Sequence, residues 1–130
     1  MTRSMIVNHV AEGAGTGQAE ERGQHEINHL RADDVLRSVC INHGVTRTEL
    51  LSRSRTRYIV RARWTAMLVL REIACWSLPR IAALLRRDHS TVINGIRTAI
   101  TCMRDDADYR DAVRRVLADA VAARGQDRRS

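Results

Sequence analysis

The stretch SLPRIAALLRRDHSTVINGIRTAI, residues 77–100, predicts two helices separated by a tight basic turn. Apolar residues recur at helical spacing in its first half, after Ser77 as N-cap and a proline in the first turn, where proline loses no hydrogen bond. Arg86 and Arg87 form the turn, and Asp88 is a suitable N-cap for the second helix. The stretch therefore predicts a pair of helices joined by a charged corner.

The second of these helices is amphipathic. Its apolar stripe consists of Val92, Ile96, Ala99, Ile100 and Met103. His89, Ser90 and Thr91 remain in its exposed first turn, beside the two arginines of the turn. A helix-turn-helix reads the DNA major groove with polar side chains from such a first turn. A helical hairpin with a solvated corner fits the same pattern, and periodicity alone leaves both interpretations open.

Two blocks of the sequence resemble one known family. SLPRIAALLRRDHSTV (77–92) resembles the signature of the C-terminal DNA-binding domain of DnaA, the bacterial replication initiator. LLSRSRTRYIVRARWTAMLVLREI (50–73) is similar to the basic loop and long central helix of that domain. The resemblance extends roughly over residues 33–104. It implies an all-α, Trp-repressor-like bundle of about six helices that contains a helix-turn-helix.

Positive charge is concentrated in the middle of the chain. All 22 basic side chains are arginine, and the net charge of the whole chain is +7. Residues 47–97 hold eleven arginines against three acidic residues. Arginine suits bidentate contacts to phosphate and guanine, although a lysine-free chain equally reflects a GC-rich genome. A basic central block of this kind favours a polyanionic partner such as double-stranded DNA.

The resemblance assigns DNA contacts to individual residues. It places Arg55, in the basic loop (residues 52–57), in the minor groove, and it places Asp88, His89 and Ser90 against base edges in the major groove. The chemistry is suitable, because a carboxylate accepts from cytosine N4 and an imidazole donates to purine N7. The expected phosphate contacts are Thr91, Arg57, Arg61, Arg86 and Arg87, with Arg63 as a further candidate. Without the resemblance, a merely solvated loop is the simpler interpretation of residues 52–57.

The sequence departs from the family pattern at three points. Ser90 replaces the usual threonine, which removes a methyl group that could touch a thymine methyl. Arg86 stands where the family usually has glycine, which adds charge and removes backbone freedom. The chain contains no lysine and therefore no GxxxxGK[ST] motif, so the initiator's ATPase is not expected.

These observations predict a DNA-binding function. We expect sequence-specific binding, as a monomer, to DnaA-box-like origin or operator sites on double-stranded DNA. The role would lie in control of replication initiation or of transcription, without enzymatic activity, metal or cofactor. The sequence does not identify the exact DNA site, nor a partner for the N-terminal segment.

The rest of the chain divides into tails and further helices. The expected parts are a disordered tail at 1–30, the DNA-binding domain at 31–105, a closing amphipathic helix at 106–124 that ends at Gly125, and a tail at 125–130. Within the domain we expect a helix capped by Asp33 or Asp34, a capping box at Thr46–Glu49 and a scaffold helix from about Tyr58 to Cys75.

The cysteines and the hydropathy pattern predict the compartment. Cys40, Cys75 and Cys102 lack CxxC spacing, and we expect them to be reduced, buried and within helices, as in a cytosolic protein. No apolar run reaches the length of a membrane span, and the amino terminus lacks a signal-peptide core. A cytoplasmic, nucleoid-associated protein is the expectation.

One motif points to a different function. His25-Glu26-Ile27-Asn28-His29 matches HExxH, in which two histidines on one helix face bind zinc and the glutamate acts as general base. A zinc metallopeptidase is therefore the alternative function. The segment lacks the apolar flanks of a buried metal helix, and neither His43 nor Asp33 is a well-motivated third ligand. We interpret the match as a chance one.

Overall fold

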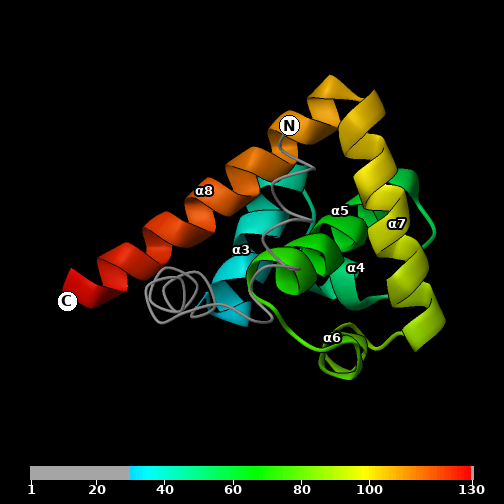
Figure 1. The fold of residues 1–130 in the computed structure, drawn as a ribbon, viewed down its shortest axis with the longest axis horizontal. Helices are drawn as coiled ribbons and strands as arrows, with labels where there is room; N and C mark the ends of the chain where they lie inside the picture. The colour runs from blue at the N-terminus through cyan, green and yellow to red at the C-terminus, as the bar shows by residue number, and fades with distance from the viewer. Residues whose placement is uncertain (1–29, 130) are drawn as a thin grey trace, which may run out of the picture.

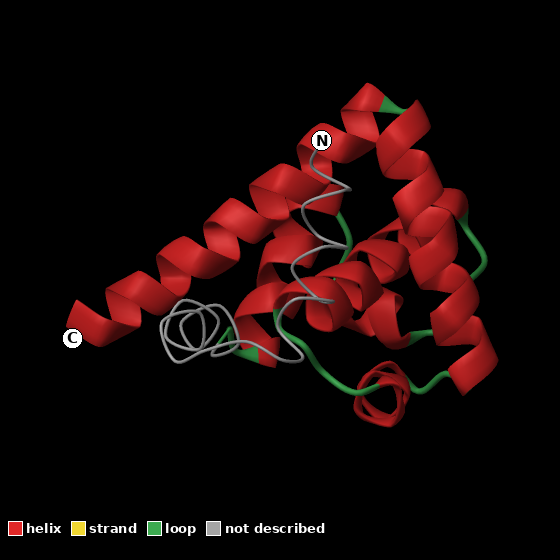
Figure 2. Ribbon diagram, in the orientation of Figure 1, coloured by secondary structure: helices red, strands yellow, loops and turns green. Residues whose placement is uncertain are grey.

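Helices account for most of residues 30–129, the part of the chain that the computed structural model describes (Figure 2). In chain order these are α3 (Ala32–His43), α4 (Arg47–Leu51), α5 (Arg57–Leu68), the π-helix η1 (Val69–Ile73), α6 (Leu78–Leu85), α7 (His89–Asp105) and α8 (Ala107–Arg129). Residues 30–129 contain no strand. The prediction of an all-α bundle of about six helices is confirmed. The HExxH match at 25–29 and the predicted tail, apart from residue 30, lie outside the described residues.

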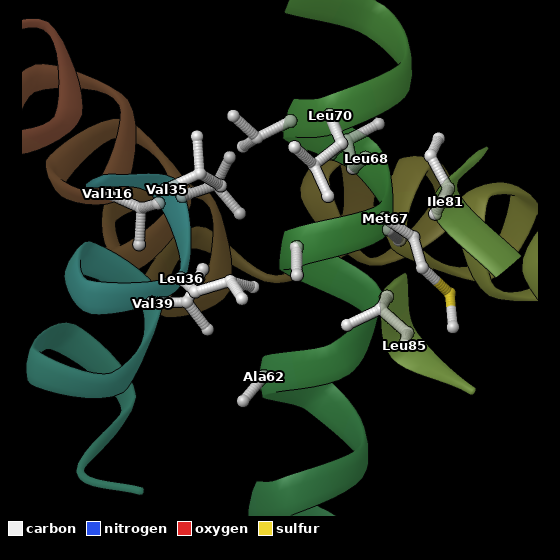
Figure 3. Close-up of a cluster of buried hydrophobic side chains, with 14 of the residues drawn as sticks. Val35, Leu36, Val39, Ala62, Met67, Leu68, Leu70, Ile81, Leu85 and Val116 are labelled. Carbon is white, nitrogen blue, oxygen red and sulfur yellow. The ribbon is translucent and has the colours of Figure 1, made fainter. Parts of the chain in front are cut away.

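Helix α5 forms the centre of the bundle (Figure 1). Its apolar side chains pack against α3 on one side and against Ile81 and Leu85 of α6 on the other (Figure 3). Ala62 and Ala66 are fully buried, as are Leu70 in η1 and Val92 in α7. Residues 65–70 are all buried. A helical segment that is apolar nearly all round is stable only in such a position, so the predicted scaffold role of this segment is confirmed.

Two helices begin as the sequence predicts. In the capping box at the start of α4, the Glu49 amide donates to Thr46 Oγ1 at 3.0 Å, and the Thr46 amide donates to Glu49 Oε1 at 2.9 Å. At the start of α6, the Arg80 amide donates to Ser77 Oγ at 3.3 Å, and Pro79 lies in the first turn. Both caps satisfy amides that have no partner inside the helix.

Helix α3 begins differently. Arg31 occupies its N-cap position and makes no side-chain capping bond, so the expectation that Asp33 or Asp34 caps this helix is wrong. Both carboxylates lie in the first turn instead, where they still interact favourably with the helix dipole. Leu30, which the predicted boundary placed in the tail, is a buried core residue.

The predicted scaffold helix ends before Cys75. Regular α-helix stops at Leu68 and is followed by a π-turn, in which the Ala74 amide donates to Val69 O at 3.0 Å. Cys75 then adopts a φ of 60°, outside any helix, and is exposed. Cys40 and Cys102 lie in helices but are only partly buried. The expectation that all three cysteines are buried within helices is therefore wrong, for Cys75 in both respects. Hydrophobic periodicity does not reveal a change from α to π hydrogen bonding.

Helix α8 closes the bundle against α3. The Ser38 hydroxyl donates to the Val116 carbonyl at 2.7 Å, and the Asn42 amide donates to Asp119 at 2.9 Å. The helix runs through Gly125 to Arg129, so the prediction that Gly125 ends it is wrong. Glycine permits the left-handed conformation that ends a helix but does not impose it. Among residues 30–129, no helix is long and apolar enough to span a membrane.

Candidate nucleic-acid interface

Helices α6 and α7 meet at the basic turn and form the helix-turn-helix. Arg86 ends α6 in the left-handed conformation, with φ 57° and ψ 50°. The Arg87 amide donates to Ala82 O at 2.9 Å, and the Arg86 amide approaches Ala83 O at 3.4 Å. This pair of bonds is the Schellman arrangement, whose left-handed position normally carries glycine. Arg86 therefore occupies a strained backbone position.

The first turn of α7 presents polar side chains to solvent. Asp88 holds the N-cap position with extended backbone, but its carboxylate makes no capping hydrogen bond. Asp88, His89, Ser90 and Thr91 are all exposed, and the buried stripe of α7 begins at Val92. The carboxylate at this helix start is thus not used by the helix itself.

A hollow of about 610 Å³ lies between the basic loop, α5 and the start of α7, and we call it the arginine hollow. Its lining residues are Arg53, Ser54, Arg55, Val60, Arg63, Trp64, Met67, Arg86, Arg87, Asp88 and Thr91. Asp88 is the one acidic residue among them. The fold therefore brings five of the predicted DNA contacts together, from two segments separated in sequence: Arg55, Arg86, Arg87, Asp88 and Thr91.

The other predicted contacts lie outside the hollow. His89 and Ser90 are exposed in the first turn of α7, and Arg57 is exposed at the start of α5. Arg61 is engaged elsewhere: its guanidinium pairs with Asp106 at 2.6 Å and lies 5.1 Å from the ring centre of Tyr109. These contacts favour a structural role for Arg61 at the junction with α8 over the expected contact with phosphate.

Arg63 is buried and binds the main chain of the basic loop. Its Nε donates to Leu50 O at 2.8 Å, and its terminal nitrogens donate to Ser54 O at 2.5 Å and Ser52 O at 2.6 Å. Burial, followed by the nearby charge of Arg87, lowers the pKa of this guanidinium. Arg63 is only 5% exposed, so its role is to shape the loop rather than to reach a ligand.

Arg87 connects the same loop to the turn of the helix-turn-helix. Its guanidinium donates to the carbonyl oxygen of Ser52 and, at 3.0 Å, to that of Arg86. Partial burial lowers the pKa of Arg87, and the charge of Arg53 lowers it further. Arg87 is therefore committed to main-chain contacts in addition to lining the hollow.

Sequence reasoning missed several residues of this surface. Arg53 lines the hollow, whereas the sequence predicts it only as part of the basic loop. Trp64 forms part of the wall with Val60 and Met67, and the spacing of these three residues on one face of α5 was the available signal. Gly95 was also missed: a Cβ there would collide with Met67 Sδ and lie 3.2 Å from Trp64 Cδ1. It sets the close approach of α7 to α5.

Comparisons with known proteins agree with this geometry. Residues 32–99, more than half of the chain, match the family described as the bacterial dnaA protein helix-turn-helix. The chromosomal replication initiator protein DnaA of Mesorhizobium japonicum is 40% identical over 73 residues, 55% of this chain and 15% of that protein. The DnaA protein of Xanthobacter autotrophicus is 39% identical over 69 residues, 52% of this chain and 14% of the relative.

A third relative gives a longer match. The DnaA protein of Rhodopseudomonas palustris is 34% identical over 89 residues, 68% of this chain and 19% of that protein. The chain thus spans less than a fifth of the length of each of these relatives. The match covers α3 to α7 up to Ala99 and so includes the basic loop, the turn and the start of α7. The chain belongs to the family of bacterial DnaA helix-turn-helix domains.

Proposed function

We propose that this protein binds double-stranded DNA sequence-specifically, at DnaA-box-like sites. The observation that carries the proposal is the arginine hollow, which is lined both by Arg55 of the basic loop and by Asp88 at the start of α7. A loop arginine and a helix start on one surface suit simultaneous contact with a minor groove and the neighbouring major groove. Membership of the family supports binding to double-stranded DNA. The preference for DnaA-box-like sites is proposed in addition.

Within this proposal different residues contact different parts of the DNA. Asp88 and His89 read base edges, the first by accepting from cytosine N4 and the second by donating to a purine. Ser90 contacts a neighbouring base, and Arg55 enters the minor groove, where narrow A·T-rich segments attract arginine. Thr91 and the first amides of α7 bind phosphate, since a helix start favours an anion. Arg57 and Arg86, both exposed, add charge along the DNA backbone.

The geometry also suggests how the protein acts. One loop and one helix form an asymmetric reader, so a monomer suffices for a short, non-palindromic site. We propose a role that requires no ATP hydrolysis: occupancy of such sites, in competition with a replication initiator or as a mark on the origin or promoter of a mobile element. Control of replication initiation or of transcription follows from that occupancy.

Selection of bound duplexes from a random pool tests the site preference. We expect one short asymmetric sequence to be enriched and footprinting to show protection confined to it. Enrichment of a palindrome would contradict the monomer, and absence of any enriched sequence would leave only a non-specific basic protein. Metal analysis of the purified full chain tests the rival zinc-peptidase function, which requires bound zinc that is lost in the variant His25→Ala.

A further inference from the structure

A stacked pair of side chains lies at the start of α6, away from the arginine hollow. The Arg80 guanidinium carbon is 3.5 Å from the ring centre of Trp76. Arg80 is exposed in the first turn of α6, whereas Trp76 is partly buried and packs against the core. The Trp76 carbonyl accepts a hydrogen bond from Arg71 Nη1 at 3.0 Å, which ties down the backbone under the ring. The positive charge of Arg80 is therefore held in a defined position.

The stack leaves the hydrogen-bonding capacity of Arg80 available. A guanidinium stacks through its flat face, while its five N–H donors lie in the plane and point outward. No ion pair to Arg80 is found among residues 30–129. Its side chain is also restricted before any ligand arrives, so binding costs less conformational entropy than for a free arginine. These features suit a ligand with oxygen acceptors and negative charge.

The position of the pair identifies that ligand. Helix α6 precedes the basic turn and lies beside the start of α7 (Figure 1). In a helix-turn-helix the second helix occupies the major groove while the first crosses the sugar–phosphate backbone. The charge of Arg80, fixed in the first turn of α6, thus lies on the helix that faces the DNA backbone. Its position is separate from those of the arginines in the basic loop and in the turn.

We propose that Arg80 is a phosphate-contacting residue and that Trp76 is the residue that positions it. This inference rests on the proposed DNA-binding function and extends the contact surface from the hollow to the start of α6. The contact is to the backbone and carries no direct sequence information, so it adds affinity for every duplex.

The test compares how the DNA affinity of the full chain depends on salt concentration in the unmodified protein and in two variants. Arg80→Ala should weaken binding by about 3- to 10-fold, both to a duplex that contains a single DnaA-type box and to a duplex in which the box sequence is scrambled. The slope of log K against log salt should fall in magnitude by about 0.9, the value for one lost phosphate contact. The matched control is Arg104→Ala, which removes one exposed arginine near the far end of α7, where Arg104 pairs with Asp105 at 3.3 Å. Its slope should be nearly unchanged.

Variants at Trp76 separate positioning from charge. Trp76→Leu keeps an apolar side chain and the Arg80 charge but removes the ring face, and it should weaken binding by about 2- to 5-fold, with partial rescue by Trp76→Phe. In the Arg80→Ala background, Trp76→Leu should have no further effect. Circular dichroism and thermal unfolding establish that each variant is folded.

The possible outcomes separate this inference from the proposed function. Equal slopes for Arg80→Ala and Arg104→Ala, in a protein that still prefers the box, would overturn the Arg80 contact alone. Additive losses at Trp76 and Arg80 would overturn the positioning role. No preference of the unmodified chain for the box would overturn the proposed function, and no DNA binding at all would overturn both.

Discussion

Arg63 and Arg87 donate hydrogen bonds to the same main-chain oxygen, the carbonyl of Ser52. Arg63 belongs to the central helix, and Arg87 belongs to the turn before α7. The shared acceptor therefore ties the basic loop to both the scaffold and the helix-turn-helix. Arg55 follows Ser52 closely in that loop, so the position of the proposed minor-groove arginine depends on two other arginines that do not need to touch DNA.

Replacing Arg63 should destabilise the fold. Arg63→Met keeps the length and the apolar stem but removes the donors to Leu50, Ser52 and Ser54. Because carbonyl groups in the loop lose their partner, we expect a loss of about 2–4 kcal/mol in the free energy of unfolding. Urea unfolding followed by circular dichroism measures it. Arg57→Ala, at an exposed position, is the control and should change stability by less than about 0.5 kcal/mol.

Arg86 should lower the stability of the fold while its positive charge strengthens DNA binding. Its φ of 57° is costly for a residue with a Cβ, so Arg86→Gly should raise the free energy of unfolding by about 1 kcal/mol. Arg86→Ala keeps the backbone strain and should not stabilise. Both variants lose one positive charge and should weaken binding to any duplex to a similar degree. Equal stability of the Gly and Ala variants would show that the left-handed position costs nothing here.

Replacing Gly95 should destabilise the protein more as the new side chain becomes larger. Gly95→Val places side-chain atoms against Met67 and Trp64, and overpacking at a helix crossing should cost about 2–3 kcal/mol of stability. Gly95→Ala gains helix propensity, and its net cost should be smaller, about 1 kcal/mol. Thermal unfolding measures both. A coupled double variant, Gly95→Ala with Met67→Ala, should be less destabilised than the two single changes predict by addition.

Stability should fall as pH is lowered from about 6.5 towards 4, because of His43. Burial, and then the charges of Arg61 and Arg115, lower the pKa of His43 from 6.5 to about 4. Its Nε2 lies 2.9 Å from Thr65 Oγ1, and Thr65 also contacts Tyr109. Between these pH values the unfolded chain binds a proton that the folded chain does not, so acid favours unfolding. After allowance for partial exposure, we expect a loss of about 1–2 kcal/mol.

The variant His43→Gln isolates this effect. Burial raises the pKa of Glu72, which acts in the opposite direction over an overlapping pH range. Asp33 and Asp106 have pKa values lowered chiefly by hydrogen bonds from Arg47 and Arg61, and their stabilisation is lost only below their ordinary value of 3.8. The difference in the free energy of unfolding between the unmodified chain and His43→Gln should therefore change only between about pH 4 and 6.5, and it should be constant above and below that range. A difference that is constant with pH would contradict the assignment to His43.

The sequence predicts the fold well where local rules apply. The Thr46–Glu49 capping box, the Ser77 cap and the apolar stripe of α7 were all readable from residue type and spacing, and the structure contains each of them. Two of the failures occur where helix geometry changes without a compositional signal. The π-turn before Cys75 and the continuation of α8 through Gly125 are such places, because the same residues are compatible with either backbone.

The candidate site was predictable in part. The first turn of α7 follows from the Asp88 N-cap position and the buried residues after it. The hydrogen bonds of Arg63 and Arg87 to Ser52 join residues far apart in the chain, and no local pattern encodes such contacts. An arginine that shapes a loop and an arginine that reaches a phosphate look alike in a sequence. Burial separates them, and burial is a property of the fold.

The start of α7 is proposed to carry the sequence specificity, and binding measurements on two duplexes separate this role from non-specific affinity. Binding of the unmodified chain, Asp88→Ala, His89→Ala and Arg86→Ala is measured by fluorescence anisotropy on a duplex with a single DnaA-type box and on a scrambled duplex, at one salt concentration. Asp88→Ala and His89→Ala should each lose about 1–3 kcal/mol on the box and much less on the scrambled duplex, whereas Arg86→Ala should weaken both to a similar degree. Equal losses on the two duplexes for all three variants would contradict the account.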